Sequence, residues 1–92
     1  MPDIVGGYTY LTGRTPLPQL WTLGYHQSRW GYDSADCIKK VAGKYRELDI
    51  PCDTMHFDID YMDGYRVFTW NEKDYGDPAE TIQELADDGF KA

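Results

Sequence analysis

Three aspartates, Asp58, Asp60 and Asp63, lie within six positions and are followed by a run of aromatic residues. Clustered carboxylates could bind calcium, but an EF-hand loop needs the pattern D-x-D-x-[DN]-G with a Glu at its twelfth position. In this sequence the fifth position of such a loop is Met62 and the twelfth is Thr69. The spacing therefore disfavours calcium, and we expect no metal site and no cofactor.

Three roles remain open for Asp58. If strand geometry continues as far as Asp60, the two carboxylates lie about 6.6 to 6.8 Å apart on one face, the lower edge of the separation in inverting glycosidases. Alternatively, Asp58 alone binds a ligand at the carboxyl end of a barrel strand, where such folds place their chemistry. In the third role, Asp58 only caps or bridges the loop that follows it.

His26 and His56 follow or lie within apolar runs that are typical of strands. No Ser or Cys is placed well enough in the sequence to propose a nucleophile with either histidine, so a hydrogen-bonded wall residue is the simpler interpretation. Cys37 and Cys52 are fifteen residues apart and form no CxxC motif. We expect two buried thiols with a packing role, and neither a zinc site nor a disulfide.

The first part of the chain predicts a helix, a connector and a strand. Residues 3–12 carry apolar side chains at helical spacing and end before a glycine. Residues 13–19, GRTPLPQ, form a proline-containing connector. Residues 20–25, LWTLGY, are a short apolar run that fits a strand buried on both faces.

A second helix follows this strand. Asp33 or Ser34 can cap its first turn, and Pro51 prevents its continuation. The residues expected on its apolar face are Ile38, Val41, Tyr45 and Leu48, and those expected on its solvated face are Lys39, Lys40, Lys44, Arg46 and Glu47.

The second half of the chain predicts a strand, a long connection and a third helix. In CDTMHFDI, residues 52–59, Met55, Phe57 and Ile59 alternate with Thr54, His56 and Asp58, which is strand periodicity. Residues 60–77 exceed the usual length of two to six residues for such a connection, which favours a functional role. The third helix starts at Asp77-Pro78, with Ile82 and Leu85 inward and Gly89 at its end, and residues 90–92 open a further strand.

Strands that alternate with helices indicate parallel pairing and an α/β fold in one domain. Two strands are too few for such a sheet to bury both of its faces. The remaining strands must be missing or supplied by another chain.

Three stretches, YTYLTGRTPLPQLW, LWTLGYHQSRWGYDS and DIPCDTMHFDIDYMDGYRVFTWN, together resemble the α-glucosidases of glycoside hydrolase family 31. The resemblance covers nearly the whole chain, in the right order and spacing. It implies a partial TIM barrel: a lead-in helix and connector at 1–19, a first βα unit at 20–50, a second at 51–89, and the start of a third strand at 90–92.

By this resemblance Asp58 binds the sugar in the subsite where cleavage occurs, and Ile59 and Trp30 are walls of the pocket. His26, His56 and Asp60 are further candidates for the pocket wall. A carboxylate suits this role because it accepts charge-assisted hydrogen bonds from sugar hydroxyls. Aromatic rings would cover the apolar C–H faces of the sugar.

The chain departs from the family in length, because a TIM barrel needs about 250 residues and this sequence has 92. The family's nucleophilic Asp follows strand four and its acid/base Asp follows strand six, and the retaining mechanism needs both. We therefore expect an inactive fragment that holds no catalytic residue but contributes to a pocket for hydrolysing terminal α-linked glucose. The alternative is a non-catalytic βα module that self-associates and has a carbohydrate-binding or interaction role. Under either hypothesis the isolated chain is expected to form a homo-oligomer.

The charge balance disfavours other classes of partner. The net charge is -7, the sequence pI is about 4.5, and the nine Lys and Arg residues are scattered. Nucleic acids and anionic membranes are bound by clustered basic residues, so we expect neither as a partner. The sequence shows no signal peptide and no apolar run long enough to span a membrane, which favours a cytoplasmic protein.

Overall fold

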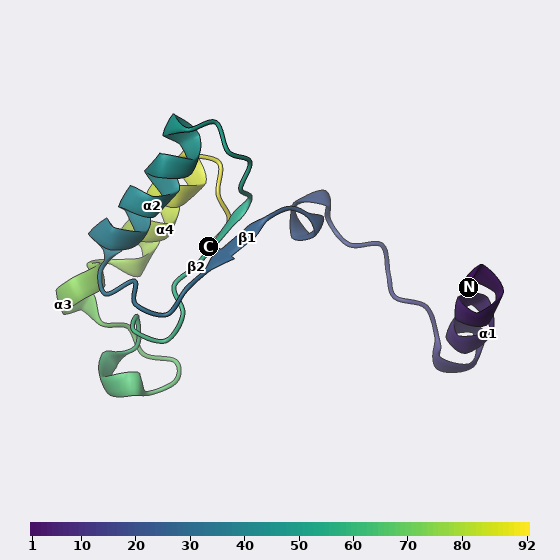
Figure 1. The fold of residues 1–92 in the computed structure, drawn as a ribbon. Coiled ribbons are helices and arrows are strands. Elements are labelled where there is room, and N and C mark those ends of the chain that lie inside the picture. The colour runs from purple at the N-terminus through teal and green to yellow at the C-terminus, as the bar shows by residue number, and fades with distance from the viewer.

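The elements alternate between helix and strand after an N-terminal helix (Figure 1). The structure, a computed structural model, describes residues 1–92. Its helices are α1 (Pro2–Thr12), α2 (Ala35–Glu47), α3 (Glu72–Tyr75) and α4 (Pro78–Asp87), its strands are β1 (His26–Ser28) and β2 (Thr54–His56), and its 3-10 turns are η1 (Leu20–Leu23) and η2 (Asp63–Tyr65). None of the helices combines the length and the apolar character that a membrane crossing requires.

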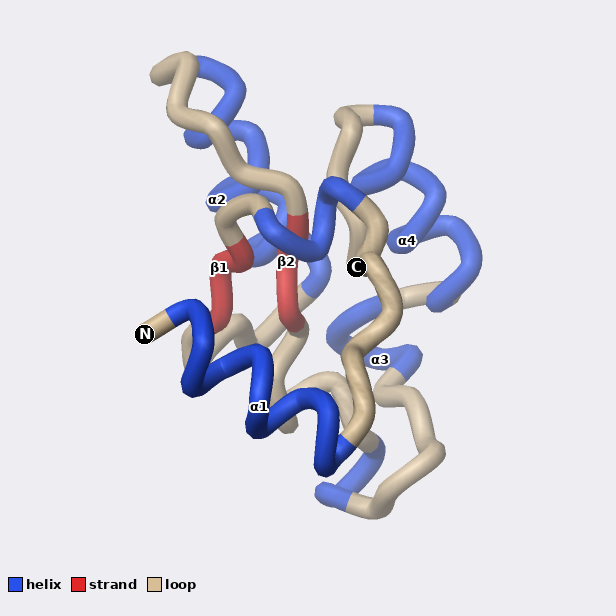
Figure 2. Tube along the Cα trace, turned by 90° about the vertical axis from the view of Figure 1, so that its right-hand side faces the viewer, coloured by secondary structure: helices blue, strands red, loops and turns tan.

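The two strands form a parallel pair in which His26 lies opposite Thr54; Figure 2 shows them side by side. A third segment joins β2 on its other edge through a parallel bridge between Thr54 and Lys91. The Met55 N–H donates to the Lys91 carbonyl at 2.8 Å, and the Lys91 N–H donates to the Asp53 carbonyl at 2.8 Å. The predicted α/β class with the start of a third strand is confirmed.

The strand predicted over residues 20–25 is wrong. Leu20–Leu23 form the 3-10 turn η1, and the strand begins only at His26. A short apolar run does not distinguish a strand from a helical turn without a layer that buries it. Leu20 and Leu23 are exposed, so no such layer is present, and Thr22 instead donates locally to the Gln19 carbonyl.

Helices α2 and α4 cover one face of the sheet (Figure 1). Local capping fixes where they start: Ser34 accepts a hydrogen bond from the Cys37 N–H at 3.2 Å, and Asp77 accepts one from the Ala79 N–H at 2.7 Å. Between the helices and the sheet lies the core, which consists of Tyr32, Ile38, Ala42, Cys52, Met55, Leu85 and Phe90.

Two predicted orientations, those of Leu48 after α2 and Ile82 on α4, are wrong. Ile82 and Leu48 were expected to face inward, yet they are 42% and 61% exposed. Thr81 is buried in place of Ile82, because its hydroxyl donates to the Tyr75 carbonyl at 2.9 Å. Arg46 is exposed, as predicted for the solvated face, and its guanidinium also makes specific contacts.

The Arg46 side chain joins three separate parts of the chain. Its guanidinium carbon lies 3.7 Å from the ring centroid of Phe90, a cation–π geometry. It also donates to the Asp88 carbonyl at 2.9 Å and to the Cys52 carbonyl at 3.1 Å. One side chain therefore ties the end of α2 to the end of α4 and to the segment that leads into β2.

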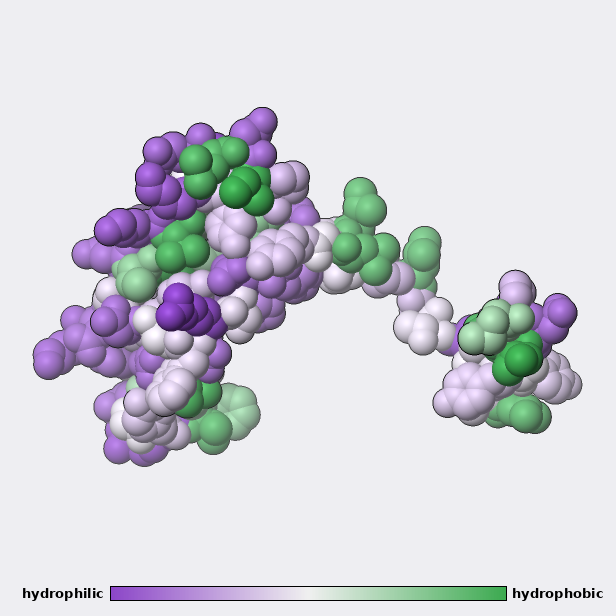
Figure 3. Space-filling view, viewed as in Figure 1, coloured by the Kyte–Doolittle hydropathy of each residue, from purple (hydrophilic) through white to green (hydrophobic).

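The opposite face of the sheet has no covering layer. Strand alternation places the side chains of His26, Ser28, Thr54 and His56 on this face. The Thr54 hydroxyl is buried there without a hydrogen-bond partner. Helix α1 confirms the helix predicted over 3–12, but none of its residues is buried. It lies apart from the body at the end of an extended connector (Figures 1 and 3), and the molecule measures 52 × 35 × 21 Å.

Leu85 and Ile82, one buried and one exposed on α4, provide a test of the core. Leu85→Ala removes a side chain that is 1% exposed and should lower the free energy of unfolding by about 2 to 5 kcal/mol. Ile82→Ala is the matched control on the same helix and should cost less than about 1 kcal/mol. Urea unfolding followed by circular dichroism measures both, and equal losses would contradict this description of the core.

Candidate functional site

An open pocket lies at the carboxyl end of β2. It has a volume of about 330 Å³. Its lining residues come from both strands, the loop after β2 and the chain end: Ser28, Met55, His56, Phe57, Asp58, Tyr61, Trp70 and Ala92. Of the residues predicted for the site, the structure brings His56 and Asp58 together in this pocket.

The backbone directs Asp58 into the pocket by leaving strand geometry. β2 ends at His56, and Asp58 adopts a φ of 62°, in the left-handed region. Asp is one of the few residues with a side chain that tolerates this conformation. The half-buried carboxylate makes no hydrogen bond or ion pair within the chain. Its oxygens are therefore free to accept hydrogen bonds from a bound molecule.

Trp70 organises the aromatic wall of the pocket. Its ring centroid lies 5.5 Å from that of Phe57 and 5.4 Å from that of Tyr61, and its edge packs on Tyr75 at 5.8 Å. The indole N–H donates to the Gly76 carbonyl at 2.7 Å, which fixes the ring. The sequence signalled aromatics after the aspartates but did not single out Trp70, Phe57 or Tyr61, because only the fold shows which rings face Asp58.

Asp60 belongs to a different environment from Asp58. It accepts hydrogen bonds from the Trp30 indole N–H at 3.4 Å and from the Tyr65 hydroxyl at 3.2 Å. The hydrogen bond to Asp60 raises the pKa of Tyr65. Asp60 lines a separate pocket that also contains Asp33. The structure therefore does not bring Asp58 and Asp60 together as a carboxylate pair.

Trp30 and Ile59 are not brought to Asp58 by these 92 residues. Trp30 is 69% exposed and Ile59 is 44% exposed, and neither lines the pocket. Their predicted role as sugar-pocket walls stays a prediction.

The two histidines pack against each other on the open face of the sheet. His26 Nδ1 lies 3.2 Å from His56 Nε2, and the rings stack with centroids 5.4 Å apart. Trp21 also stacks on His26, with ring centroids 6.0 Å apart. His56 lines the pocket, whereas His26 does not line it and packs against His56 instead. The Nε2 atom of His26 is buried without a hydrogen-bond partner.

No group of three or more His, Cys, Asp or Glu side chains is arranged to hold a metal ion. Cys52 is buried, whereas Cys37 is only partly buried, and neither forms a disulfide. The prediction of two buried thiols is therefore right for Cys52 and wrong in degree for Cys37.

Tyr75 packs against Trp70 of the aromatic wall but does not line the pocket itself. It is buried, and its hydroxyl donates to the Tyr32 carbonyl. Burial raises the pKa of Tyr75 to about 12 from an ordinary value of 10.0, and the nearby carboxylates of Asp60, Asp33 and Asp74 add to this effect.

The raised pKa of Tyr75 predicts a loss of stability at high pH. Because the folded pKa lies above the unfolded one, the contribution is complete below pH 10 and disappears as pH rises towards 12. Tyr75→Phe should lower stability at pH 8, through the lost hydrogen bond, but flatten its decline between pH 10 and 12. Tyr10→Phe, at an exposed position of α1, is the control and should change neither. Urea midpoints at each pH measure the effect, and identical slopes for Tyr75→Phe and the unchanged chain would refute it.

A parallel sheet backed by helices, with a pocket at the carboxyl end of a strand, is found in (β/α)8 barrels and in open α/β sheets. Residues 15–92 match the model of the glycosyl hydrolases family 31 TIM-barrel domain, so the chain belongs to this family. The family resemblance inferred from the sequence motifs is thereby confirmed.

Two of the similar proteins are α-glucosidases of much greater length. The chain is 43% identical over 89 residues to Alpha-glucosidase 2 of Bacillus thermoamyloliquefaciens. This alignment covers 97% of the chain and 11% of that protein. The chain is 47% identical over 73 residues to Neutral alpha-glucosidase AB of Dictyostelium discoideum. This alignment covers 79% of the chain and 8% of that protein. The chain thus spans about a tenth of the length of these relatives.

Solved structures show the same fold. The crystal structure of an ER glucosidase II complex matches with a TM-score of 0.88 and 39% identity, over 97% of the chain and 10% of the solved one. A family 31 α-glucosidase from Bacteroides thetaiotaomicron matches with a TM-score of 0.83 and 40% identity, over 96% of the chain and 15% of the solved one.

Proposed function

We propose that these 92 residues form part of the sugar pocket of an α-glucosidase that hydrolyses terminal α-linked glucose. The observation that carries the proposal is the carboxylate of Asp58, which faces an aromatic pocket and has no partner within the chain. The names of the relatives support the substrate class.

The pocket offers the two kinds of contact that a sugar needs. Asp58 can accept hydrogen bonds from hydroxyl groups, and a charged acceptor forms bonds roughly twice as strong as a neutral one. Trp70, Phe57 and Tyr61 present ring surface to the apolar C–H faces of the sugar. Asp58 is thus a sugar-binding residue.

The same geometry argues against catalysis by these residues alone. A retaining glycosidase needs two carboxylates about 5 to 5.5 Å apart across the scissile bond. Asp58 is the only acidic side chain that lines the pocket, and Asp60 is engaged by Trp30 and Tyr65 elsewhere. The nucleophile and the acid/base of the proposed reaction therefore lie outside these residues.

Glucose binding tests this role of Asp58. Asp58→Asn removes the charge but keeps a residue that tolerates the left-handed backbone. Because hydrogen bonds to a charged group contribute about 1.5 to 3 kcal/mol, we expect glucose affinity to fall roughly 10- to 100-fold in an NMR titration. Asp49→Asn is the matched control, because Asp49 is exposed and has a φ of 53°; it should bind glucose as the unchanged chain does.

Two results would overturn the proposal. One is equal glucose affinity in the unchanged chain and Asp58→Asn. The other is turnover of a chromogenic α-glucoside by the 92-residue chain that Asp58→Asn abolishes, which would make Asp58 part of the catalytic machinery.

A second candidate function is that of a non-catalytic βα module that self-associates. Its support is the sheet, which has one uncovered face and a free edge on β1 as well as on the Lys91 segment. Unpaired strand edges are templates for pairing with another chain. Copies could thus cover each other's open surfaces, including the one at His56 and Asp58.

Self-association predicts a mass above that of one chain. Multi-angle light scattering on the purified protein should show an average mass that rises with concentration from 10.6 kDa towards a multiple of it. A well-folded monomer at every concentration would exclude this function but leave the sugar-pocket proposal untouched.

A further inference from the structure

His56 has one free ring nitrogen in the wall of the pocket that contains Asp58. The His56 side chain lines this pocket, and its Nε2 lies 3.2 Å from Nδ1 of His26. This separation is shorter than the 5.4 Å between the ring centroids, so the two nitrogens face each other. Because Nε2 is occupied by His26, Nδ1 is the ring nitrogen of His56 that a bound molecule can contact.

The contact between the two rings restricts where their protons lie. In a neutral imidazole, one nitrogen bears the proton and donates, and the other nitrogen accepts. Two nitrogens that face each other at 3.2 Å share a single proton. Either His26 donates to His56, or His56 donates to His26. The second nitrogen of His26 decides between these two arrangements.

Nε2 of His26 is buried without a hydrogen-bond partner. If His56 were the donor, this atom would carry a buried N–H that no acceptor satisfies, and such groups are rare because nothing compensates their desolvation. If His26 donates from Nδ1, its Nε2 bears no proton, and the unsatisfied donor disappears. Nε2 of His56 then accepts, so the proton of His56 lies on Nδ1.

The charge of Asp58 favours the same arrangement. Its carboxylate lines the same pocket as His56. A negative charge attracts an N–H dipole and repels the lone pair of a bare nitrogen, which favours a proton on Nδ1 of His56. The pocket then contains a charged acceptor and a ring donor. A sugar hydroxyl group, which both donates and accepts, can bond to either.

We propose that His56 donates a hydrogen bond from Nδ1 to a hydroxyl oxygen of the bound sugar, and that His26 is the positioning residue that keeps the proton there. This inference rests on the proposed function, the sugar pocket at Asp58. It adds the residue that recognises hydroxyl oxygens, whereas Asp58 recognises hydroxyl protons.

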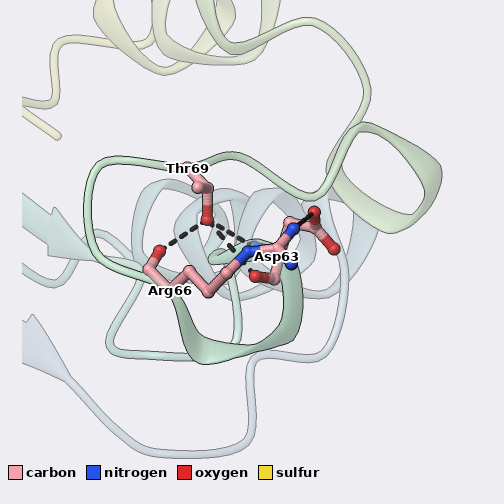
Figure 4. Close-up of polar contacts among 3 residues, drawn as sticks. All are labelled: Asp63, Arg66 and Thr69. Carbon is pink, nitrogen blue, oxygen red and sulfur yellow. Dashed lines mark hydrogen bonds and ion pairs between the residues drawn. The ribbon is translucent and has the colours of Figure 1, made fainter.

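The aromatic wall of the pocket is held independently of the two histidines. Tyr61 and Trp70 flank a loop that a clasp of Asp63, Arg66 and Thr69 closes (Figure 4). The Asp63 N–H donates to the Thr69 hydroxyl at 3.0 Å, and the Arg66 guanidinium pairs with the Asp63 carboxylate. Substitutions of the histidines should therefore leave this wall in place.

NMR of the 92-residue chain reads the proton positions directly. Long-range ¹H–¹⁵N correlation spectra distinguish proton-bearing from bare ring nitrogens, and they should be recorded near about pH 8, where histidine is ordinarily neutral. We expect the proton on Nδ1 in both His26 and His56. A proton on Nε2 of His26 or of His56 would overturn the inference.

Two amide substitutions separate the donor from the shape of the side chain. Gln places its amide near the position of Nε2, so His56→Gln keeps a group that faces His26 but loses the donor in the pocket. Glucose affinity in an NMR titration should then fall roughly 3- to 10-fold, the effect of one neutral hydrogen bond. Asn places its amide nitrogen near the position of Nδ1, so His56→Asn should recover most of this loss.

His26 provides the corresponding test of positioning. His26→Leu removes the donor to His56, so the ¹⁵N spectra should show His56 with part of its proton on Nε2, and glucose affinity should fall. His26→Asn keeps a donor near the position of Nδ1 and should restore both signals. Tyr8→Phe is the control, because it removes a ring-borne donor from the exposed helix α1, and it should bind glucose as the unchanged chain does.

The outcomes distinguish this inference from the proposed function. If His56→Gln binds glucose as tightly as the unchanged chain while Asp58→Asn does not, the donor role of His56 fails and the sugar pocket stands. If the unchanged chain does not bind glucose, the proposed function fails and this inference fails with it, whichever tautomer the spectra show.

Discussion

The hydrogen-bonded ladder centred on β2 is the constraint on which the rest of the structure depends. The Asp53 N–H donates to the Tyr25 carbonyl at 2.9 Å on one side, and the Met55 N–H donates to the Lys91 carbonyl at 2.8 Å on the other. Met55 then points into the helical layer, and its neighbours in the strand point to the uncovered face. This alternation leaves the carboxyl end of β2 open to solvent between two other segments, where the pocket forms.

The pocket depends on this ladder ending where it does. Because β2 stops at His56, the residues after it no longer alternate between the two faces of the sheet. The backbone of Asp58 then adopts a left-handed conformation. The rings of Trp70, Phe57 and Tyr61 then form the aromatic side of the pocket. Arg46 stabilises the arrangement from the opposite end, since it joins α2, α4 and the entry to β2 through the core residue Phe90.

Features set by local chemistry could be predicted from the sequence. The starts of α2 and α4 follow from Ser34 and Asp77, with side chains that bond the first free N–H groups, and the motifs around Asp58 were sufficient for the family. Features set by distant packing could not be predicted. The run at 20–25 forms a turn because no layer covers it, and Arg46 is held by groups 6 to 44 positions away. The spacing of Asp58 and Asp60 suggested a pair only under the assumption that the strand continues.

The extended connector between α1 and η1 increases the apparent size of the molecule in gel filtration. A compact domain of this length has a radius of gyration of about 12 Å, whereas the value here is 17.3 Å. The difference arises because a short helix is carried far from the centre of mass while the body itself stays small. A single copy will therefore elute early in gel filtration and resemble a pair of compact ones, so elution volume is an unreliable guide to its stoichiometry.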